Sequence, residues 1–392
     1  MDVETVKDYA VDVGKFFDSK ENLSSKELSD GNINYVFKVE NLKTNKSLVI
    51  KQADKFLRSS GRPLDLYRNK IEAEILKIEN QLAPGLVPEI YYYDENMAAL
   101  SMEDISDYKN MRLELDKGVI FPNFSNEISD FMVNTLLPTT DLILSRKDKK
   151  ERVKLFTNIE LCDITEDLVF TEPYYDYKSR NIITEGNEEF VKEYLYNDEV
   201  LKAEVGKLRN SFMNNAQALI HGDLHSGSIF INQNGIKVID PEFAFYGPMG
   251  YDIGNVIGNL FFSLVNKLYT EPNNTKFTNW LKKEIASVYD KTFSKFNSKF
   301  DEIVNFPLYN ETFKFYYLNE ISSDTIGCAG TELIRRTVGD SKVMEISSIT
   351  DHNLKLKMER ILVKLGISLI KGRNNINSGE QIIELFESIV NG

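Results

Sequence analysis

Three acidic side chains stand at the two ends of a segment whose pattern predicts a β-hairpin. Asp223 lies in the loop before residues 229–239, which contain two short β-branched runs separated by an Asn-Gly pair. Asp240 and Glu242 directly follow the second run. Asn-Gly between two such runs is a strong signal for a tight hairpin turn, so the loops at the open end of the hairpin lie side by side. We therefore expect the three carboxylates to be close together and to share one cation.

Carboxylates gathered at one hairpin end repel one another unless a multivalent cation lies among them, and Mg²⁺ with nucleotide phosphates suits such hard oxygen ligands. The alternative is that these acids are ordinary solvated turn residues. The surrounding loop favours the first interpretation, because His221-Gly222 precedes Asp223 and the small residues Ser226, Gly227 and Ser228 follow it. This combination is typical of phosphoryl transfer, in which a protein positions the acceptor and neutralises developing charge.

The same segment resembles the catalytic core of the protein-kinase-like superfamily, in the branch of small-molecule kinases that includes aminoglycoside phosphotransferases and choline kinases. Within that branch, residues 221–229 and 238–248 resemble the 5-methylthioribose kinase family, in which Asp-x-Glu replaces the Asp-Phe-Gly of protein kinases. Residues 161–166, 169–173 and 332–337 agree with the same family. The resemblance extends from about residue 31 to the carboxyl end.

The resemblance implies that ATP phosphorylates S-methyl-5-thioribose to its 1-phosphate, a cytoplasmic step of methionine salvage. Asp223 would be the catalytic acid-base or would orient the acceptor hydroxyl. Asp240 and Glu242 would hold the Mg²⁺ that bridges the phosphates. Ser228 stands where protein kinases have an Asn that takes a second metal, and Glu242 would compensate for this weaker ligand.

On the nucleotide side, Lys51 ends a β-rich run and matches the lysine that contacts nucleotide phosphates. Glu72, on the helix that follows, matches its ion-pair partner, and Glu74 remains the competing partner. Gly31 and Asn32 precede the first strand of this run, where a small turn lets backbone amides approach phosphates. The resemblance also implies a connector whose backbone hydrogen-bonds adenine, at Met102, Glu103 and Ile105.

The acceptor side would be formed by Asn34 and by the adjacent pair Arg335 and Arg336. Adjacent side chains on a helix point about 100° apart, so a solvated surface pair is the alternative for the two arginines. The resemblance instead implies that both guanidinium groups enter the site and hold sugar hydroxyls or the charge of the transferring phosphoryl group.

Other residues near these motifs carry structural expectations or depart from the family pattern. His221 and His225 suit bracing of the loop better than general-base catalysis, and Asp252 is expected to brace the same loop or to cap the following helix. Arg62 stands where the family has a Trp in a nucleotide-side loop, and residues 339–342 replace a His-containing stretch. Both departures bear on how the site closes.

Composition excludes several other classes of protein. The 392-residue chain has a formal net charge of -13, which argues against a nucleic-acid surface. Its two cysteines, Cys162 and Cys328, have no metal-ligand spacing, so we expect neither zinc nor a disulfide framework, as in a reducing cytosol. Residues 1–20 are unlike a signal peptide and predict a surface helix. No apolar run reaches the length of a membrane span, so we expect no membrane partner.

The patterns along the chain predict an α+β, protein-kinase-like bilobal fold. Two β-rich runs form a hairpin, a helix follows it, and two more strands come next, at residues 35–40, 48–52, 64–78, 87–93 and 98–102. Helical periodicity dominates afterwards, at residues 113–161, 191–219 and from 253 onward. We therefore expect a small antiparallel-sheet lobe with a leading helix at residues 1–105 and a larger, mainly helical lobe at residues 106–392.

Two other functions stay open at this point. One is a kinase of another hydroxyl acceptor, such as a related deoxysugar, an aminoglycoside or choline, because the acidic tracts at residues 94–95 and 163–167 suit a cationic acceptor. The other is a pseudokinase that binds a nucleotide without turnover. A homodimer would be in keeping with the family resemblance.

Overall fold

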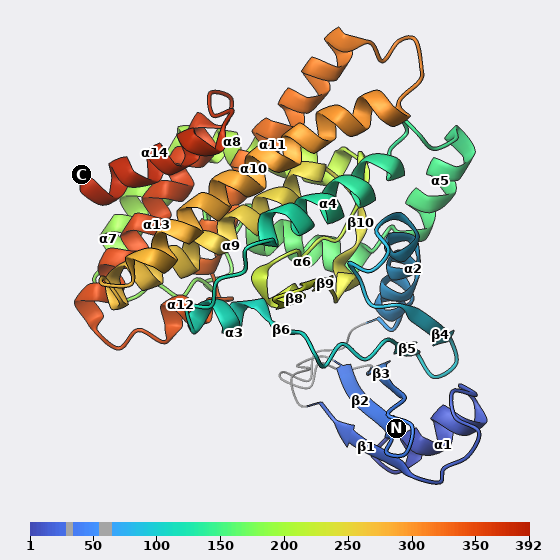
Figure 1. The fold of residues 1–392 in the computed structure, drawn as a ribbon. Coiled ribbons are helices and arrows are strands. Elements are labelled where there is room, and N and C mark those ends of the chain that lie inside the picture. The colour runs from blue at the N-terminus through green and yellow to red at the C-terminus, as the bar shows by residue number, and fades with distance from the viewer. Residues whose placement is uncertain (29–33, 55–64) are drawn as a thin grey trace.

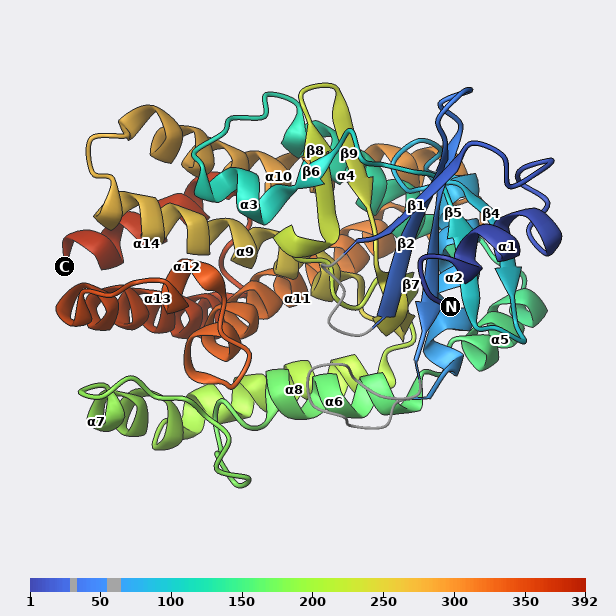
Figure 2. The ribbon, with the colours of Figure 1, turned by 90° about the horizontal axis from the view of Figure 1, so that it is seen from below.

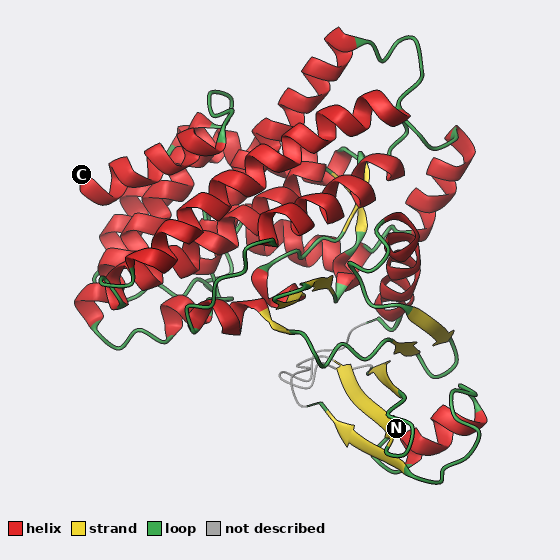
Figure 3. Cartoon of the chain, in the orientation of Figure 1, coloured by secondary structure: helices red, strands yellow, loops and turns green. Residues whose placement is uncertain are grey.

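The computed structural model of the chain describes residues 1–28, 34–54 and 65–392. An antiparallel sheet with two helices lies at one end, and long helices form most of the remainder (Figure 1, Figure 3). The strands are β1 (Leu23–Glu27), β2 (Asn34–Asn41), β3 (Ser47–Ala53), β4 (Ile90–Asp94), β5 (Ala99–Met102), β6 (Lys109–Asn110), β7 (Ala218–Ile220), β8 (Ile229–Asn232), β9 (Gly235–Val238) and β10 (Phe245–Gly247).

The helices within the described ranges begin with α1 (Thr5–Asp12), α2 (Tyr67–Leu82), α3 (Met111–Asp116), α4 (Phe124–Leu136), α5 (Arg146–Leu155), α6 (Ile159–Phe170) and α7 (Glu188–Val191). They continue with α8 (Glu199–Asn214), α9 (Met249–Thr270), α10 (Thr275–Ile303), α11 (Glu311–Val338), α12 (Met344–Ser347), α13 (His352–Gly372) and α14 (Gly379–Asn391). Short 3₁₀ turns at Ser226–Ser228 and Pro241–Phe243 flank the hairpin of β8 and β9.

The first sheet has the strand order β1-β2-β3-β5-β4, with every neighbouring pair antiparallel. Successive side chains of a strand point to opposite faces, and β3 follows this rule. Ile50 packs in the cluster that α1 completes through Val6 and Tyr9, whereas Val49 joins the main core. Helix α2 contacts β4, β5 and the Pro241–Phe243 turn. This packing brings the face of β3 that carries Val49 close to the Pro241–Phe243 turn at the open end of the hairpin.

Several elements differ from the sequence prediction. The amino-terminal helix covers only Thr5–Asp12, and its apolar side is buried against the sheet. Strand β1 was not predicted, because four of its five residues are Ser, Lys or Glu and carry little apolar signal. The end of the predicted helical run at 191–219 is wrong, since Ala218–Ile220 forms β7 and pairs with β10. Three apolar residues are too few to separate a strand from a helix by periodicity.

The hairpin of β8 and β9 is present, but its turn lies one residue earlier than predicted. Asn232 pairs with Gly235, so residues 233–234 form the two-residue loop rather than Asn-Gly. The Asn232 side chain accepts hydrogen bonds from the backbone N–H groups of Asn234 and Gly235, at 2.8 and 3.1 Å respectively. An Asx-type turn therefore closes the hairpin.

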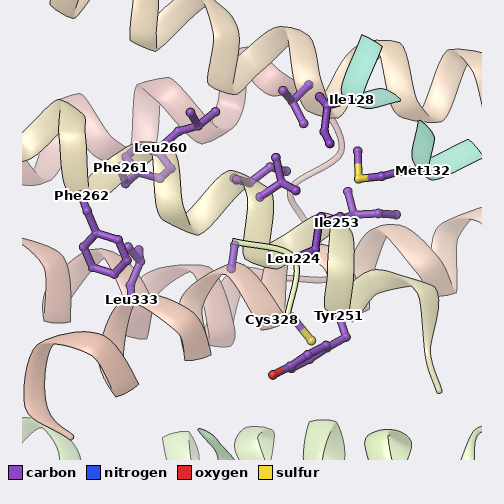
Figure 4. Packing of buried hydrophobic residues seen from close by; sticks show 14 of the residues in the cluster. Ile128, Met132, Leu224, Tyr251, Ile253, Leu260, Phe261, Phe262, Cys328 and Leu333 are labelled. Carbon is purple, nitrogen blue, oxygen red and sulfur yellow. The ribbon is translucent and has the colours of Figure 1, made fainter. Parts of the chain in front are cut away.

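Helices α9, α11 and α13 pack against one another, and α10 also packs against α9 (Figure 2). Gly254 of α9 permits this close approach, because a Cβ there would lie 2.6 Å from the Ala329 backbone N of α11. Figure 4 shows Leu224, from the loop before β8, among Ile253 and Tyr251 of α9 and Cys328 of α11. The loop that carries Asp223 is thus anchored in the largest hydrophobic core.

That core also crosses the predicted lobe boundary, since Val49 and Leu100 of the first sheet belong to the same cluster as the helices. None of the helices in the described ranges is both long enough and apolar enough to span a membrane.

Candidate active site

Lys51 lies between two carboxylates that come from different parts of the chain. Its Nζ is 2.7 Å from Glu72 Oε1 on α2 and 2.5 Å from Asp240 Oδ1 after β9. Glu74 instead pairs with Lys77, so the competing partner is excluded in this structure. Burial lowers the pKa of Lys51, but the charges of Asp240 and Glu72 outweigh burial and raise it overall. Lys51 is therefore a buried ammonium group, and Asp240 keeps a half-exposed side chain beside it.

Asp223 is surrounded by cationic and imidazole groups. Its Oδ1 lies 3.5 Å from Arg335 Nη2 and 3.6 Å from Arg336 Nη2, and its Oδ2 lies 3.4 Å from His225 Nε2. Burial raises the pKa of Asp223, yet His225 and the two arginines lower it well below its usual range. The side chain remains 25% exposed, so an ionised carboxylate is accessible to a ligand. The alternative of a solvated arginine pair is wrong for this structure, because both guanidinium groups turn inward.

Hydrogen bonds from several elements fix the loop around Asp223. Asp252, in the first turn of α9, accepts from the backbone N–H groups of His221 and Gly222 at 2.7 and 3.0 Å. His225 Nδ1 accepts from the Gly227 N–H at 3.0 Å, and the Ser228 hydroxyl donates to the Asp223 carbonyl at 3.0 Å. The bracing roles expected for His225 and Asp252 are confirmed. The Ser228 hydroxyl forms its hydrogen bond within the loop itself.

Gly222 could not be replaced by a larger residue without moving this loop. Its φ is +82°, and a Cβ would lie 2.3 Å from the Phe243 carbonyl oxygen. Only glycine combines that backbone conformation with that close approach. The glycine thus lets the Asp223 loop contact the segment that carries Glu242.

Glu242 is held by residues that the sequence did not single out. Arg68 of α2 places Nε 3.3 Å from Glu242 Oε2 and donates from Nη2 to Asn34 Oδ1 at 3.1 Å. Asn158 donates to the backbone carbonyls of Glu242 and Ala244 at 2.9 and 3.0 Å. The sequence held one signal for this contact: Arg68 falls within the predicted helix at 64–78, and a cation on the buried face of a helix is unusual.

The expectation that three carboxylates share one cation is wrong as stated. Asp223 faces the arginines, Asp240 faces Lys51, and Glu242 faces Arg68. In residues 1–28, 34–54 and 65–392, no group of three or more His, Cys, Asp or Glu side chains is arranged to hold a metal ion. Opposite charges compete for each carboxylate, so the hairpin alone does not converge them.

Two of these carboxylates nevertheless fit a Mg²⁺ site that is completed by phosphate oxygens and water. Glu242 Oε2 is buried and, apart from its ion pair with Arg68, has no hydrogen-bond partner among the described residues. Burial raises the pKa of Glu242. Asp240, with a left-handed φ of 61°, lies on the same short segment and is half exposed. Mg²⁺ usually binds one or two protein carboxylates together with phosphates and waters.

The remaining predicted residues lie in various places. Met102 ends β5. The Glu103 N–H donates to the Glu89 carbonyl at 2.8 Å, and the Glu103 carboxylate lies 2.8 Å from Lys237 Nζ. Ile105 follows in the connector towards β6, and its carbonyl accepts from the Tyr108 N–H at 2.9 Å. Gly31, Asn32 and Arg62 lie outside the described residues.

The departure at residues 339–342 lies against the acceptor side. Arg336 Nη1 donates to the Ser341 carbonyl at 3.4 Å, and Lys342 pairs with the buried Glu359 of α13 at 3.1 Å. This segment therefore contacts one of the two arginines that face Asp223.

Comparisons with known proteins show the family and the fold of this chain. Residues 165–275 match the model of the "Phosphotransferase enzyme family". A choline kinase from Cryptosporidium parvum Iowa II has a similar fold, with a TM-score of 0.52, 15% identity, and coverage of 93% of this chain and 98% of that one. The fold is the protein-kinase-like one, with a small antiparallel sheet and a mainly helical remainder. Fold and site together define a phosphotransferase of the small-molecule kinase class.

Curated relatives narrow that class. A methylthioribose kinase from Geobacillus sp. (strain WCH70) is 37% identical over 375 residues, which cover 94% of this chain and 91% of the relative. A methylthioribose kinase from Yersinia enterocolitica is 34% identical over 381 residues, with 96% and 95% covered. The chain belongs to the methylthioribose kinase family.

Proposed function

We propose that this enzyme transfers the γ-phosphoryl group of ATP to the 1-hydroxyl of S-methyl-5-thioribose, giving the 1-phosphate that methionine salvage uses. The observation that carries the proposal is the accessible Asp223 carboxylate beside Arg335 and Arg336, in a loop that adjoins the Lys51 and Asp240 pair. The names of the full-length relatives support the choice of acceptor.

In the proposed reaction, the P–O bond between the γ-phosphorus and ADP breaks while the acceptor oxygen forms a new P–O bond. Asp223 orients the hydroxyl and takes its proton, a role that suits a carboxylate held ionised by neighbouring cations. The guanidinium groups of Arg335 and Arg336 are placed to neutralise charge near the acceptor. Positioning and electrostatics dominate in such transfers, because the protein forms no covalent bond itself.

The donor would lie between two lobes, which we propose to divide at residue 105 as residues 1–105 and 106–392. Lys51 would contact the phosphates. Its ion pair with Glu72 fixes the ammonium group beside the half-exposed carboxylate of Asp240. Asp240 and Glu242 would hold Mg²⁺, which supplies charge neutralisation of the phosphates when it is bound. Arg68 orients Glu242, since it contacts that carboxylate from α2.

Three carboxylates of the two acidic tracts already have partners in the structure. Asp94 is buried and accepts from the N–H groups of Asn96 and Met97, and Glu95 pairs with Lys70. Asp167 contacts Lys178 and Arg180. These carboxylates already have partners, so they offer little charge to an amine-bearing substrate.

The test is a steady-state assay of purified enzyme with ATP, Mg²⁺ and a panel of acceptors: methylthioribose, a related deoxysugar, an aminoglycoside and choline. We expect methylthioribose 1-phosphate as the product, identified by phosphorus NMR. Asp223→Asn should lower kcat by about 10²–10⁴-fold, the usual contribution of a positioned proton acceptor, and should leave the KM for ATP nearly unchanged.

Asp301→Asn is the matched control, because Asp301 is half exposed and pairs with Lys314 at the far end of α10. It should behave like wild type. Preference for an amine-bearing acceptor would overturn the proposed substrate, and full turnover by Asp223→Asn would overturn the role of that residue.

A further inference from the structure

Two adjacent arginines on one helix reach the same oxygen atom, which is an uncommon arrangement. Arg335 and Arg336 lie in the last turn of α11, and their side chains leave the helix about 100° apart. Nevertheless, the Nη2 atoms of both lie within 3.6 Å of Asp223 Oδ1. Something other than helix geometry must bend the two side chains towards each other.

Glu332 supplies that constraint from one turn earlier on the same helix. It stands three residues before Arg335 and four before Arg336, the two spacings at which helix side chains meet. Its Oε2 accepts from Arg335 Nε in a short hydrogen bond, and its Oε1 accepts from Arg336 Nε at 3.1 Å. Both Nε atoms are thereby engaged, and the Nη2 ends project towards Asp223.

The Glu332 carboxylate is fully buried and ionised. Burial alone would raise the pKa of Glu332, but the charges of Arg335 and Arg336 lower it to about 2. A buried carboxylate of this kind interacts strongly with its partners because little water screens it. One negative charge is thus shared by two guanidinium groups, which leaves a net positive edge facing Asp223.

Asn259 of α9 fixes the orientation of that carboxylate. Its Nδ2 donates to Glu332 Oε1 at 2.9 Å and to the Asn255 carbonyl at 3.0 Å. Its Oδ1 accepts from Arg112 Nη2 at 2.8 Å. The amide has donors and an acceptor on opposite sides, so these three contacts define which way it points.

Arg112 connects Asn259 to the loop that carries Asp223. From α3 its Nε donates to the Ser226 hydroxyl at 3.1 Å, three residues after Asp223. The loop, Arg112, Asn259, Glu332 and the arginine pair therefore form one continuous polar network, in which Asn259 and Glu332 are fully buried. A displacement of Glu332 would change the position of the arginines relative to Asp223.

We propose that Glu332 is a positioning residue for the acceptor half of the reaction, holding Arg335 and Arg336 as a pair that faces Asp223 without closing on it. This inference rests on the proposed function and goes beyond it. Without the Glu332 charge, each guanidinium would move from its long contact with Asp223 to a direct ion pair. Asp223 would then be occupied by arginine rather than by the acceptor hydroxyl.

The test compares Glu332→Gln with wild type in steady-state kinetics. The substitution keeps the shape of the side chain and removes its charge. A misplacement of about 1 Å costs roughly 100-fold in rate, so we expect kcat/KM for the acceptor to fall by about 100-fold. The KM for ATP should change less than about twofold, because within the described residues Lys51 hydrogen-bonds to Glu72 and Asp240 and not to this network.

Glu311→Gln is the matched control on the same helix, where Glu311 is exposed and pairs with Lys314. It should match wild type in both parameters. Glu332→Asp keeps the charge and shortens the reach, so it should recover part of the acceptor-side loss. Wild-type kinetics in Glu332→Gln would overturn the proposal, and so would equal losses on the acceptor and ATP sides.

A second variant covers the case in which Glu332→Gln fails to fold. Asn259→Ser removes the donor to Glu332 and the acceptor for Arg112, and it should reproduce the acceptor-side loss at about 10-fold, within the range for residues that orient functional groups. An unchanged acceptor KM and kcat in this variant would overturn the proposal.

The assays use whichever acceptor the wild-type enzyme phosphorylates. If that acceptor is not methylthioribose, the proposed substrate fails while the role of Glu332 is still tested.

Discussion

Lys51 illustrates how single residues in this enzyme combine structural and functional demands. Its ammonium group is buried between Glu72 and Asp240, and the charge of each partner offsets the cost of its burial. The removal of one member of such a group leaves an uncompensated buried charge, which destabilises a protein more than the removal of the whole pair. Stability and nucleotide binding can therefore be separated by mutation.

Lys51→Met should lower the free energy of unfolding by about 3–5 kcal/mol, the usual effect of breaking a buried pair. Glu72, only 1% exposed, would lose its cation. In the double variant Lys51→Met with Glu72→Gln, most of that stability should return, while the KM for ATP stays raised. Urea unfolding and steady-state kinetics measure the two effects.

Lys70→Met is the control for this cycle, because Lys70 pairs with Glu95 on the surface, where water screens the pair, and its loss should leave stability nearly unchanged. Recovery of ATP binding together with stability in the double variant would contradict the role assigned to Lys51.

The elements were predictable where local pattern decides them. The hairpin followed from its β-branched runs. The ion pair of Lys51 and Glu72 was implied by the family resemblance, because the strand and helix pattern alone left Glu74 as a competing partner. The partners of Glu242 were not predictable, because Arg68 and Asn158 reach it from positions far away in the sequence. The shared cation site failed for the same reason: spacing along a hairpin does not reveal which cations other elements will bring.

Helix α9 provides the clearest element-scale test, because Asp252 in its first turn holds the Asp223 loop. Burial raises the pKa of Asp252 to about 7, although the N–H groups of His221 and Gly222 act in the opposite direction. The ordinary value is 3.8, so the folded protein binds this proton more tightly than the unfolded chain does. The stability from this group is complete below pH ~4 and is lost as the pH rises through ~7.

The expected size is about 4 kcal/mol, because one pKa unit corresponds to about 1.4 kcal/mol. Asp252→Asn should remove this part of the pH dependence, so the stability difference between wild type and variant should shift by that order between pH 4 and 7. Urea unfolding at several pH values checks it. Parallel curves for the two proteins would show that Asp252 does not titrate in this range.

At the scale of the whole molecule, contacts between the first sheet and the helical part are both apolar and ionic. Val49 and Leu100 join the main core, and Lys51 and Arg68 reach Asp240 and Glu242. Strand β3 and helix α2 therefore carry one cation each to the edge at which the hairpin presents its carboxylates. Asp240 and Glu242 each have one cationic partner in this structure. A ligand that brings several negative charges together with a divalent cation would therefore keep the charges at this edge balanced.

ATP with Mg²⁺ should therefore raise the unfolding temperature of the enzyme by a few degrees, because a ligand at 100 times its Kd stabilises a folded protein by about 2.7 kcal/mol. Removal of Mg²⁺ with EDTA should shrink this shift, as Asp240 and Glu242 would then repel the triphosphate instead of sharing a cation with it. Glu242→Gln should reduce the dependence on Mg²⁺, whereas Glu311→Gln, at an exposed carboxylate on α11, should not. Differential scanning fluorimetry measures all four conditions. An ATP shift that is identical with and without Mg²⁺ would contradict the assignment of these two carboxylates to the metal.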